Sequence, residues 1–187
     1  MRLSVTTLEA YRLYLNGIVS QEDLIKQITG VFEPSKYMEY GKKFHEILEK
    51  PNTDHKINDL EFDKNDMIKC REFILPAALN EVKSTKMYGD TELVGKVDQI
   101  FGNLILEHKT TFSYINLQKY MDSLQWKCYL DIFGADRVIY NIFHFNNKLE
   151  LKNIETFEVG RYAGLEKYIR TMISSYNEFY KKIYSKR

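Results

Sequence analysis

Two short turns, each beginning with glycine, divide the middle of the chain and constrain its fold more than any other feature. Gly89-Asp90 and Gly102-Asn103 separate three stretches in which apolar and polar residues tend to alternate. A period of two is typical of β-strands, and glycine in the first position suits the type II′ turns of tight hairpins. The sequence therefore predicts an antiparallel meander of three strands, over residues 79–88, 91–101 and 104–109.

The register of this meander places charged side chains in rows on one face. With two-residue turns, Glu81 faces Asp98, and Asp98 in turn faces Glu107. Two like charges about 5 Å apart repel by roughly 3 kcal/mol at an effective dielectric constant of about 20. A divalent cation bound by the carboxylates would offset this repulsion, whereas the alternative is a solvated sheet face with weak cross-strand ion pairs. The next row consists of three lysines, Lys83, Lys96 and Lys109.

Apolar residues at helical spacing predict helices before and after the meander. The predicted helices lie near residues 8–15, 21–28, 35–50, 65–75, 116–133 and 165–183, and a polar surface excursion is expected over 51–64. A strongly apolar strand over 137–145 and a more polar edge strand ending near residue 159 complete the sheet. The apolar seam of the last helix is expected to pack on its own sheet, with a dimer or partner interface as the alternative.

Composition narrows the classes of function. Lys and Arg number 27 against 26 Asp and Glu, so a nucleic-acid partner would need a local basic groove. No apolar run approaches the ~18 residues of a membrane span, and the first fifteen residues lack the layout of a signal peptide. We therefore expect a cytoplasmic protein without membrane contact. Cys70 and Cys128 are too few for a disulfide framework and are expected to be buried free thiols.

Four short motifs occur in a specific order along the chain. They are Gly41-Lys-Lys-Phe-His45, Gly95-Lys-Val-Asp98, Glu107-His108-Lys109 and Gln125-Trp-Lys-Cys-Tyr129. Together they resemble the PD-(D/E)XK nuclease superfamily, and specifically the branch of RecB-type nuclease domains and CRISPR-adaptation exonucleases. In that branch a histidine-bearing helix, a GxxD motif, an ExK motif and a QxxxY motif follow one another. The resemblance covers roughly residues 35–145.

The resemblance implies an α/β fold with a restriction-endonuclease-like αβββαβ core, in which helices flank a mixed central sheet. We expect a single nuclease domain over residues 1–187, with a C-terminal strand and long helix over 148–184. The chain departs from the iron-sulfur members of the branch, which carry four cysteines around the nuclease core, because it has only two.

Roles for individual residues also follow from the resemblance. His45, Asp98, Glu107 and the backbone carbonyl of His108 match the metal ligands of the family, and Glu81 matches an accessory acid. Lys109 matches the lysine that orients the attacking water and stabilises charge at phosphorus. The QxxxY pair, Gln125 and Tyr129, matches residues that position the substrate or this lysine. Helical spacing independently places the pair on one face. The implied cofactor is Mg²⁺ or Mn²⁺, and an imidazole ligand suits Mn²⁺ better.

The expected function is that of a metal-dependent DNA nuclease. An exonuclease acting in recombination, repair or phage DNA processing is favoured, since the branch has this tendency. A homo-oligomer and a helicase or recombinase partner stay open. The alternative is a non-cutting nuclease-fold module that binds DNA or a helicase, against which the complete set of motif residues argues. The side chains of His55, His144 and His108 are expected to be structural.

Overall fold

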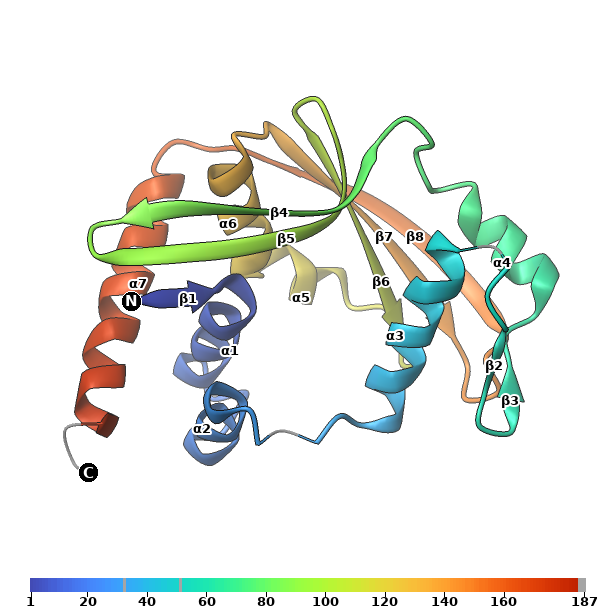
Figure 1. Ribbon diagram of the computed structural model, residues 1–187, viewed down its shortest axis with the longest axis horizontal. Helices are drawn as coiled ribbons and strands as arrows, with labels where there is room; N and C mark the ends of the chain where they lie inside the picture. The colour runs from blue at the N-terminus through green and yellow to red at the C-terminus, as the bar shows by residue number, and fades with distance from the viewer. Residues whose placement is uncertain (32, 51, 185–187) are drawn as a thin grey trace.

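The computed structural model describes residues 1–31, 33–50 and 52–184, and at its centre lies a six-stranded mixed sheet flanked by helices (Figure 1). The elements in chain order are β1 (Arg2–Ser4), α1 (Val5–Leu15), α2 (Gln21–Thr29), α3 (Lys36–Glu49), β2 (Lys56–Ile57), β3 (Leu60–Glu61), α4 (Lys64–Arg71), β4 (Leu79–Tyr88), β5 (Thr91–Phe101), β6 (Leu104–Thr111), α5 (Leu117–Met121), α6 (Leu124–Phe133), β7 (Arg137–Phe145), β8 (Leu151–Gly160) and α7 (Leu165–Tyr184). The predicted α/β fold with a mixed central sheet is confirmed.

The three-stranded meander is also confirmed, together with its turns. Gly89 and Gly102 have φ values of 60° and 57°, while the residues after them stay outside the left-handed region, as type II′ turns require. Lys83 pairs with Lys96 as predicted. The lysine row is wrong in its third member, because β6 leaves β5 and Lys109 pairs with Ile142 of β7 instead.

Two strands pair with different parts of the same edge of β5. β4 pairs along the other edge, whereas β1 runs parallel to residues 92–94 and β6 runs antiparallel from Gln99 to Phe101. In the described chain, residues 95–98 therefore have no partner strand on the shared edge. β6 continues instead beside β7 in a parallel ladder, so β5 and β6 form a fork that opens after the pair Gln99 and Leu106.

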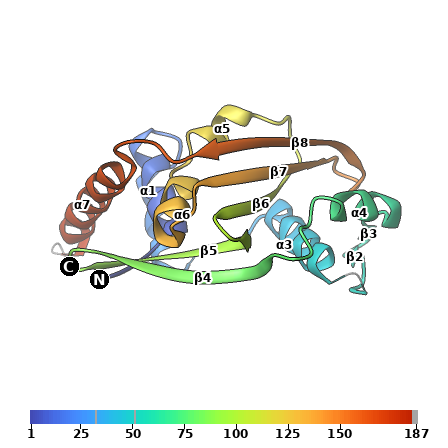
Figure 2. The same ribbon diagram turned by 90° about the horizontal axis from the view of Figure 1, so that it is seen from above.

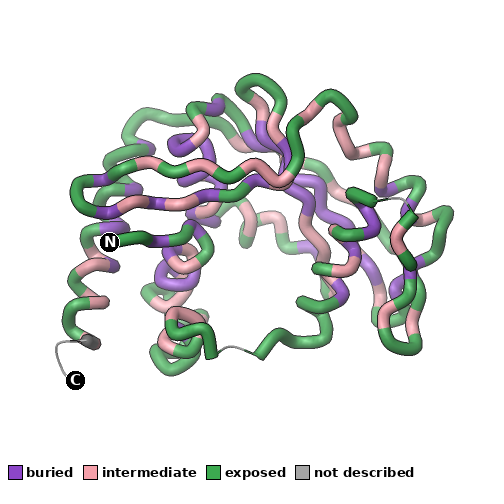
Figure 3. Tube along the Cα trace, viewed as in Figure 1, coloured by how far each residue is buried: buried purple, intermediate pink, exposed green. Residues whose placement is uncertain are grey.

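Two groups of helices pack against the sheet from different ends (Figure 2). Strand β7 contributes to both hydrophobic cores, because alternate side chains point to opposite faces. Val138, Tyr140 and Ile142 join the core of α1, α6 and α7, whereas Phe143 and Phe145 join the core of α3 and α4. The buried residues concentrate along the middle strands, and the outer helical faces are exposed (Figure 3).

The predicted continuous helix over 116–133 is wrong, because it is broken into α5 and α6. Ser123 caps α6, and its hydroxyl accepts a hydrogen bond from the Gln125 N–H at 3.1 Å. The Leu124 N–H donates to the Glu9 carboxylate at 2.7 Å, which fixes the new helix start from outside the segment. Met121, the last residue of α5, is 47% exposed as a result.

Other differences concern short elements. The N-terminal strand β1 was not predicted, and the polar excursion over 51–64 contains the hairpin β2–β3 and the fully buried Phe62. The apolar seam of α7 packs mainly on helices of this chain. The ring centroid of Tyr11 in α1 lies 5.4 Å from that of Tyr176 and 5.2 Å from that of Phe179. No helix within the described ranges is long and apolar enough to cross a membrane.

A buried carboxylate in α6 joins this helix to β4. The side chain of Asp131 is 3% exposed, accepts hydrogen bonds from the Tyr88 hydroxyl and from Lys86 Nζ, and lies 3.6 Å from Arg161. Burial alone would raise the pKa of Asp131, but the hydrogen bonds from Tyr88 and Lys86 lower it below its usual value of 3.8. The folded state therefore favours the charged form.

We expect Asp131→Asn to lower the free energy of unfolding at pH 7 by about 1–3 kcal/mol, because charged hydrogen bonds are lost. Since folding lowers the pKa of Asp131, this contribution is present above about pH 4 and is lost as the pH falls through the folded-state value. Urea unfolding of both proteins from pH 7 down to the lowest pH at which the wild type still folds checks this, with the exposed Asp59→Asn as the control. A difference that stays constant with pH would contradict the assignment.

Candidate active site

The two carboxylates of the site stand where β6 leaves β5. The backbone ladder ends at Gln99 and Leu106, so the N–H groups beyond it need other acceptors. The Asp98 N–H donates to Glu107 Oε1 at 3.2 Å, and the His108 N–H donates to Asp98 Oδ2 at 2.8 Å. These crossed hydrogen bonds hold the two carboxylates next to each other inside the fork.

Lys109 supplies the positive charge at this point. Its Nζ donates to Glu107 Oε2 at 2.6 Å, and the Glu107 side chain is 1% exposed. Burial raises the pKa of Glu107, and the charge of Asp98 raises it further, to about 7. Burial alone would lower the pKa of Lys109, but Glu107 and Asp98 raise it well above its usual value. Lys109 is therefore a cation at neutral pH.

The helix α3 brings His45 to the fork. A Cβ atom on Gly41 would lie 2.8 Å from Thr110 Oγ1, so the close approach of α3 to β6 requires glycine. One turn later, the imidazole of His45 donates a hydrogen bond to the backbone carbonyl of His108 and lies near Asp98. Burial lowers the pKa of His45, which favours a neutral imidazole.

The helix α6 lies close over β5 on account of another glycine. A Cβ atom on Gly95 would be 3.3 Å from Tyr129 Cδ1, which is tighter than most such contacts. Tyr129 shares a hydrogen bond with Gln125, and burial raises its pKa, as does the charge of Glu107. The structure therefore places the QxxxY pair beside the carboxylates and Lys109.

Glu81 stands apart from the carboxylate pair. Its φ of 55° lies in the left-handed region, and the pairing of β4 with β5 is regular on both sides of it but not at it. The carboxylate forms an ion pair with Lys96. A cavity of about 400 Å³ is lined by Glu81, His45 and Asp98, so Glu81 faces the same space without contacting its predicted neighbour directly.

The donor set suits a hard divalent cation. Two carboxylates, one imidazole and one backbone carbonyl are ligands that Mg²⁺ and Mn²⁺ accept. Within the described ranges, however, no three His, Cys, Asp or Glu side chains form a group that could hold a metal ion as they stand. Both oxygens of Glu107 are engaged, by the Asp98 N–H and by Lys109. A cation would have to replace one of these contacts.

Tyr140 is a residue of the site that the sequence did not indicate. In the parallel ladder of β6 and β7 it lies opposite Glu107, it is 1% exposed, and its hydroxyl has no hydrogen-bond partner among the described residues. Burial raises the pKa of Tyr140, and Glu107 adds to this effect while Lys109 opposes it. The only signal in the sequence was a phenol within an apolar strand, and the partner of that strand could not be deduced from local turns.

The remaining histidines lie outside this arrangement. The ring of His108 points away from the carboxylates, with Nε2 3.3 Å from Gln99 Oε1 and Nδ1 3.4 Å from Asn141 Nδ2. Burial lowers the pKa of His108 to about 4, so its ring is neutral. His55 is buried under the β2–β3 hairpin region, and His144 is partly exposed on β7.

Solved structures share this arrangement of strands and helices. A phage-related exonuclease from Haemophilus somnus 129PT matches with a TM-score of 0.62 at 13% identity, over 100% of this chain and 96% of that one. The alkaline exonuclease LHK-Exo from Laribacter hongkongensis matches with a TM-score of 0.52 at 12% identity, over 99% and 94%. The chain has the fold of these exonucleases. The predicted resemblance to PD-(D/E)XK nucleases is thereby confirmed at the level of the fold.

One more solved structure shares this fold, whereas two comparisons of the sequence found no match. LHK-Exo in complex with dAMP matches with a TM-score of 0.54 at 14% identity, over 98% of this chain and 93% of that one. No protein-family model and no curated protein matches the sequence.

Proposed function

We propose that this protein is a metal-dependent DNA nuclease, and more specifically an exonuclease that acts on DNA ends. The observation that carries the proposal is the fork of β5 and β6, where two carboxylates and one partly buried lysine meet. The fold shared with exonucleases supports it. A deoxynucleotide bound to one neighbour of this fold supports DNA as the substrate. We also propose that the chain is a single nuclease domain. Its activity would serve recombination, repair or phage DNA processing.

In this proposal the cation is Mg²⁺ or Mn²⁺, held by Asp98, Glu107, His45 and the carbonyl of His108, with Glu81 available for a second ion. A divalent cation bound there would polarise the phosphoryl oxygen and lower the pKa of a bound water. The neutral imidazole of His45 can serve as a ligand without losing a proton, provided that its hydrogen bond to the His108 carbonyl opens so that both groups face the cation.

The other residues act on charge and position. Lys109 keeps its proton, so it acts as a fixed positive charge beside the phosphorus and not as a general base. Its ion pair with Glu107 orients the ammonium group before substrate arrives. Gln125 and Tyr129 limit the movement of this end of the site, because they are hydrogen-bonded to each other on the overlying helix.

Incubation with linear and circular duplex DNA, in Mg²⁺ or in Mn²⁺, tests the proposal. We expect mononucleotides or short products from linear DNA and little cutting of closed circles. Cutting of both forms at equal rates would indicate an endonuclease. Binding of DNA without any cutting in either metal would favour the non-cutting module and contradict the proposal.

We expect Gly41→Ala to reduce the rate of cutting by roughly tenfold to a hundredfold, because the new methyl group displaces α3 and with it His45. Alanine is the better helix former by about 1 kcal/mol, so the thermal stability should fall less than the activity. Rates and melting temperatures of the variant check this.

A second substitution supplies the control. Thr110→Ala removes the oxygen that the methyl group would meet, so the double variant should recover most of the activity. Thr110→Ala alone should behave like the wild type. A double variant no better than Gly41→Ala would show that the close approach of α3 to β6 is not what places His45.

A further inference from the structure

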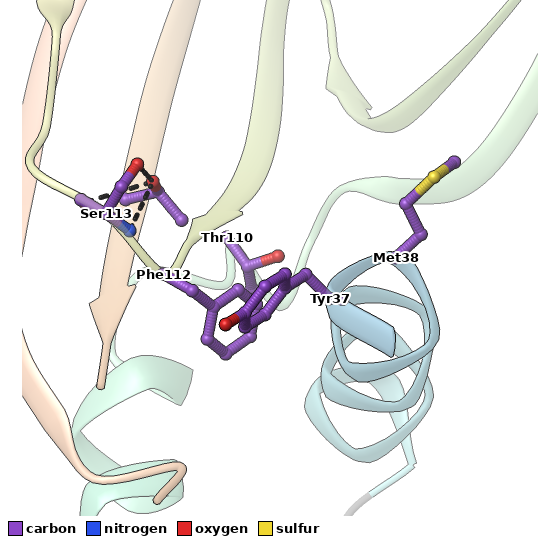
Figure 4. Close-up of a pocket in the computed structure, with 7 residues that line it drawn as sticks. Tyr37, Met38, Thr110, Phe112 and Ser113 are labelled. Carbon is purple, nitrogen blue, oxygen red and sulfur yellow. Dashed lines mark hydrogen bonds between the residues drawn. The ribbon is translucent and has the colours of Figure 1, made fainter. Parts of the chain in front are cut away.

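A cavity of about 540 Å³ lies beside the candidate active site, between the first half of α3 and the segment that follows β6 (Figure 4). This volume falls within the range of pockets that bind small organic ligands. Its lining includes Tyr37, Met38, Gly41, Thr110, Phe112 and Ser113. None of the lining side chains is a carboxylate, so a ligand that carries phosphate meets no like charge from them.

The cavity is built on the same two elements as the candidate site. Gly41 precedes His45 by one helical turn, about 6 Å along the axis, and Thr110 directly follows Lys109 on β6. The side chains of Lys109 and Thr110 point to opposite faces of β6, so the link between the two sites runs along α3, from Gly41 to His45. A strand of DNA with one phosphate at the fork would reach the cavity with a neighbouring nucleotide if it follows α3.

One wall of the cavity is aromatic, and its rings pack on buried aromatic side chains of the core. The rings of Tyr37 and Phe112 stack against each other (Figure 4), and their centroids are 5.2 Å apart. The centroid of the Phe112 ring lies in turn 6.3 Å from that of the fully buried Phe145 and 5.7 Å from that of Tyr40. The outermost ring of this stack, Tyr37, is 38% exposed.

Polar groups hold this aromatic wall in place and border it. The Tyr37 hydroxyl donates to Asn147 Oδ1 at 3.2 Å, and Lys36 Nζ lies over the Tyr37 ring, 5.0 Å from its centroid, so a base that stacks on this ring takes the place of the Lys36 ammonium group. Thr111 Oγ1 accepts from the Ser113 N–H at 3.3 Å and donates to the Ser113 carbonyl at 3.1 Å, which orders the chain after β6. The ring is thus positioned before any ligand binds.

We propose that this cavity binds an unpaired nucleobase of the substrate strand, stacked on Tyr37, next to the phosphodiester at the fork. The inference rests on the proposed nuclease function. Every base has a flat face, so stacking on a tyrosine selects single-stranded DNA without selecting sequence. The cavity would therefore keep the last nucleotides of a frayed DNA end apart from their complement.

The test measures binding of fluorescent single-stranded oligonucleotides in EDTA, where no divalent cation supports cutting. We expect Tyr37→Ala to weaken binding about 5- to 100-fold, and Tyr37→Phe to bind nearly as the wild type does. Abasic sites are placed one at a time along the oligonucleotide. At one position the abasic site should weaken binding to the wild type and have no further effect on Tyr37→Ala.

Matched variants and a separate assay distinguish the outcomes. Tyr162→Ala removes a similarly exposed ring, 43% exposed, on the loop between β8 and α7, and should leave binding unchanged. Equal binding by Tyr37→Ala and wild type, or losses that add at every abasic position, would overturn the subsite. Cutting of DNA in Mn²⁺ is measured independently. If the protein cuts DNA but the losses from Tyr37→Ala and from the abasic site add at every position, only the subsite is refuted. If the two losses overlap at one position but no DNA is cut, only the nuclease function is refuted.

Discussion

Replacing Lys109 by methionine should slow phosphodiester hydrolysis roughly a hundredfold to a thousandfold while Mn²⁺ still binds. The partly buried ammonium group of Lys109 offers its charge where negative charge develops in the transition state, and this interaction gains strength only there. Glu107 can take up a proton when its partner is lost, because its pKa is already about 7. The variant should therefore fold. Single-turnover rates on linear duplex DNA, with Mn²⁺ affinity from calorimetry, measure the two effects separately.

Lys83→Met is the matched control, since this lysine lies exposed on β4 and carries the same charge. It should cut at nearly the wild-type rate. If Lys109→Met cuts as fast as the wild type, then the Glu-x-Lys match is a coincidence of sequence, and the ion pair in the fork has only a structural role.

Asp98→Asn should abolish most of the stabilisation that Mn²⁺ gives to the protein. A cation at a hundred times its dissociation constant stabilises the folded state by about 2.7 kcal/mol, which corresponds to a rise in melting temperature of about 5–10 °C for a chain of this size. A hundredfold loss of affinity would leave a rise of about 1 °C. Asparagine retains an acceptor for the His108 N–H, so the fork itself should persist.

Asp90→Asn supplies the control for this shift, because Asp90 is an exposed residue in the turn of the same hairpin. Melting curves with and without Mn²⁺, together with rates of cutting, are the measurements. Equal stabilisation of the wild type and Asp98→Asn would remove Asp98 from the metal site, whatever its effect on the rate.

The meander was predictable because its determinants are local. Gly89 and Gly102 fix two tight turns, and the turns fix the register without knowledge of the rest of the chain. The adjacency of Asp98 and Glu107 follows from that register. Ser35 and the apolar stripe after it likewise define the helix that carries His45.

What could not be predicted depends on distant partners. The break before α6 is fixed in part by Glu9, which lies 115 positions away from Leu124. The fork arises because β6 leaves β5 after Leu106 while it stays paired with β7 along its other edge, and parallel pairing of distant strands leaves no turn signal in the sequence. For the same reason the place of Tyr140 opposite Glu107 was not visible.

We expect the fork of β5 and β6 to assemble a divalent metal centre for phosphodiester hydrolysis. Crystals of the protein soaked in Mn²⁺, with diffraction recorded at an energy where manganese scatters anomalously, test it most directly. We expect an anomalous peak between Asp98, Glu107, His45 and the carbonyl of His108. Manganese bound elsewhere, with none at the fork at a concentration that supports cutting, would contradict it.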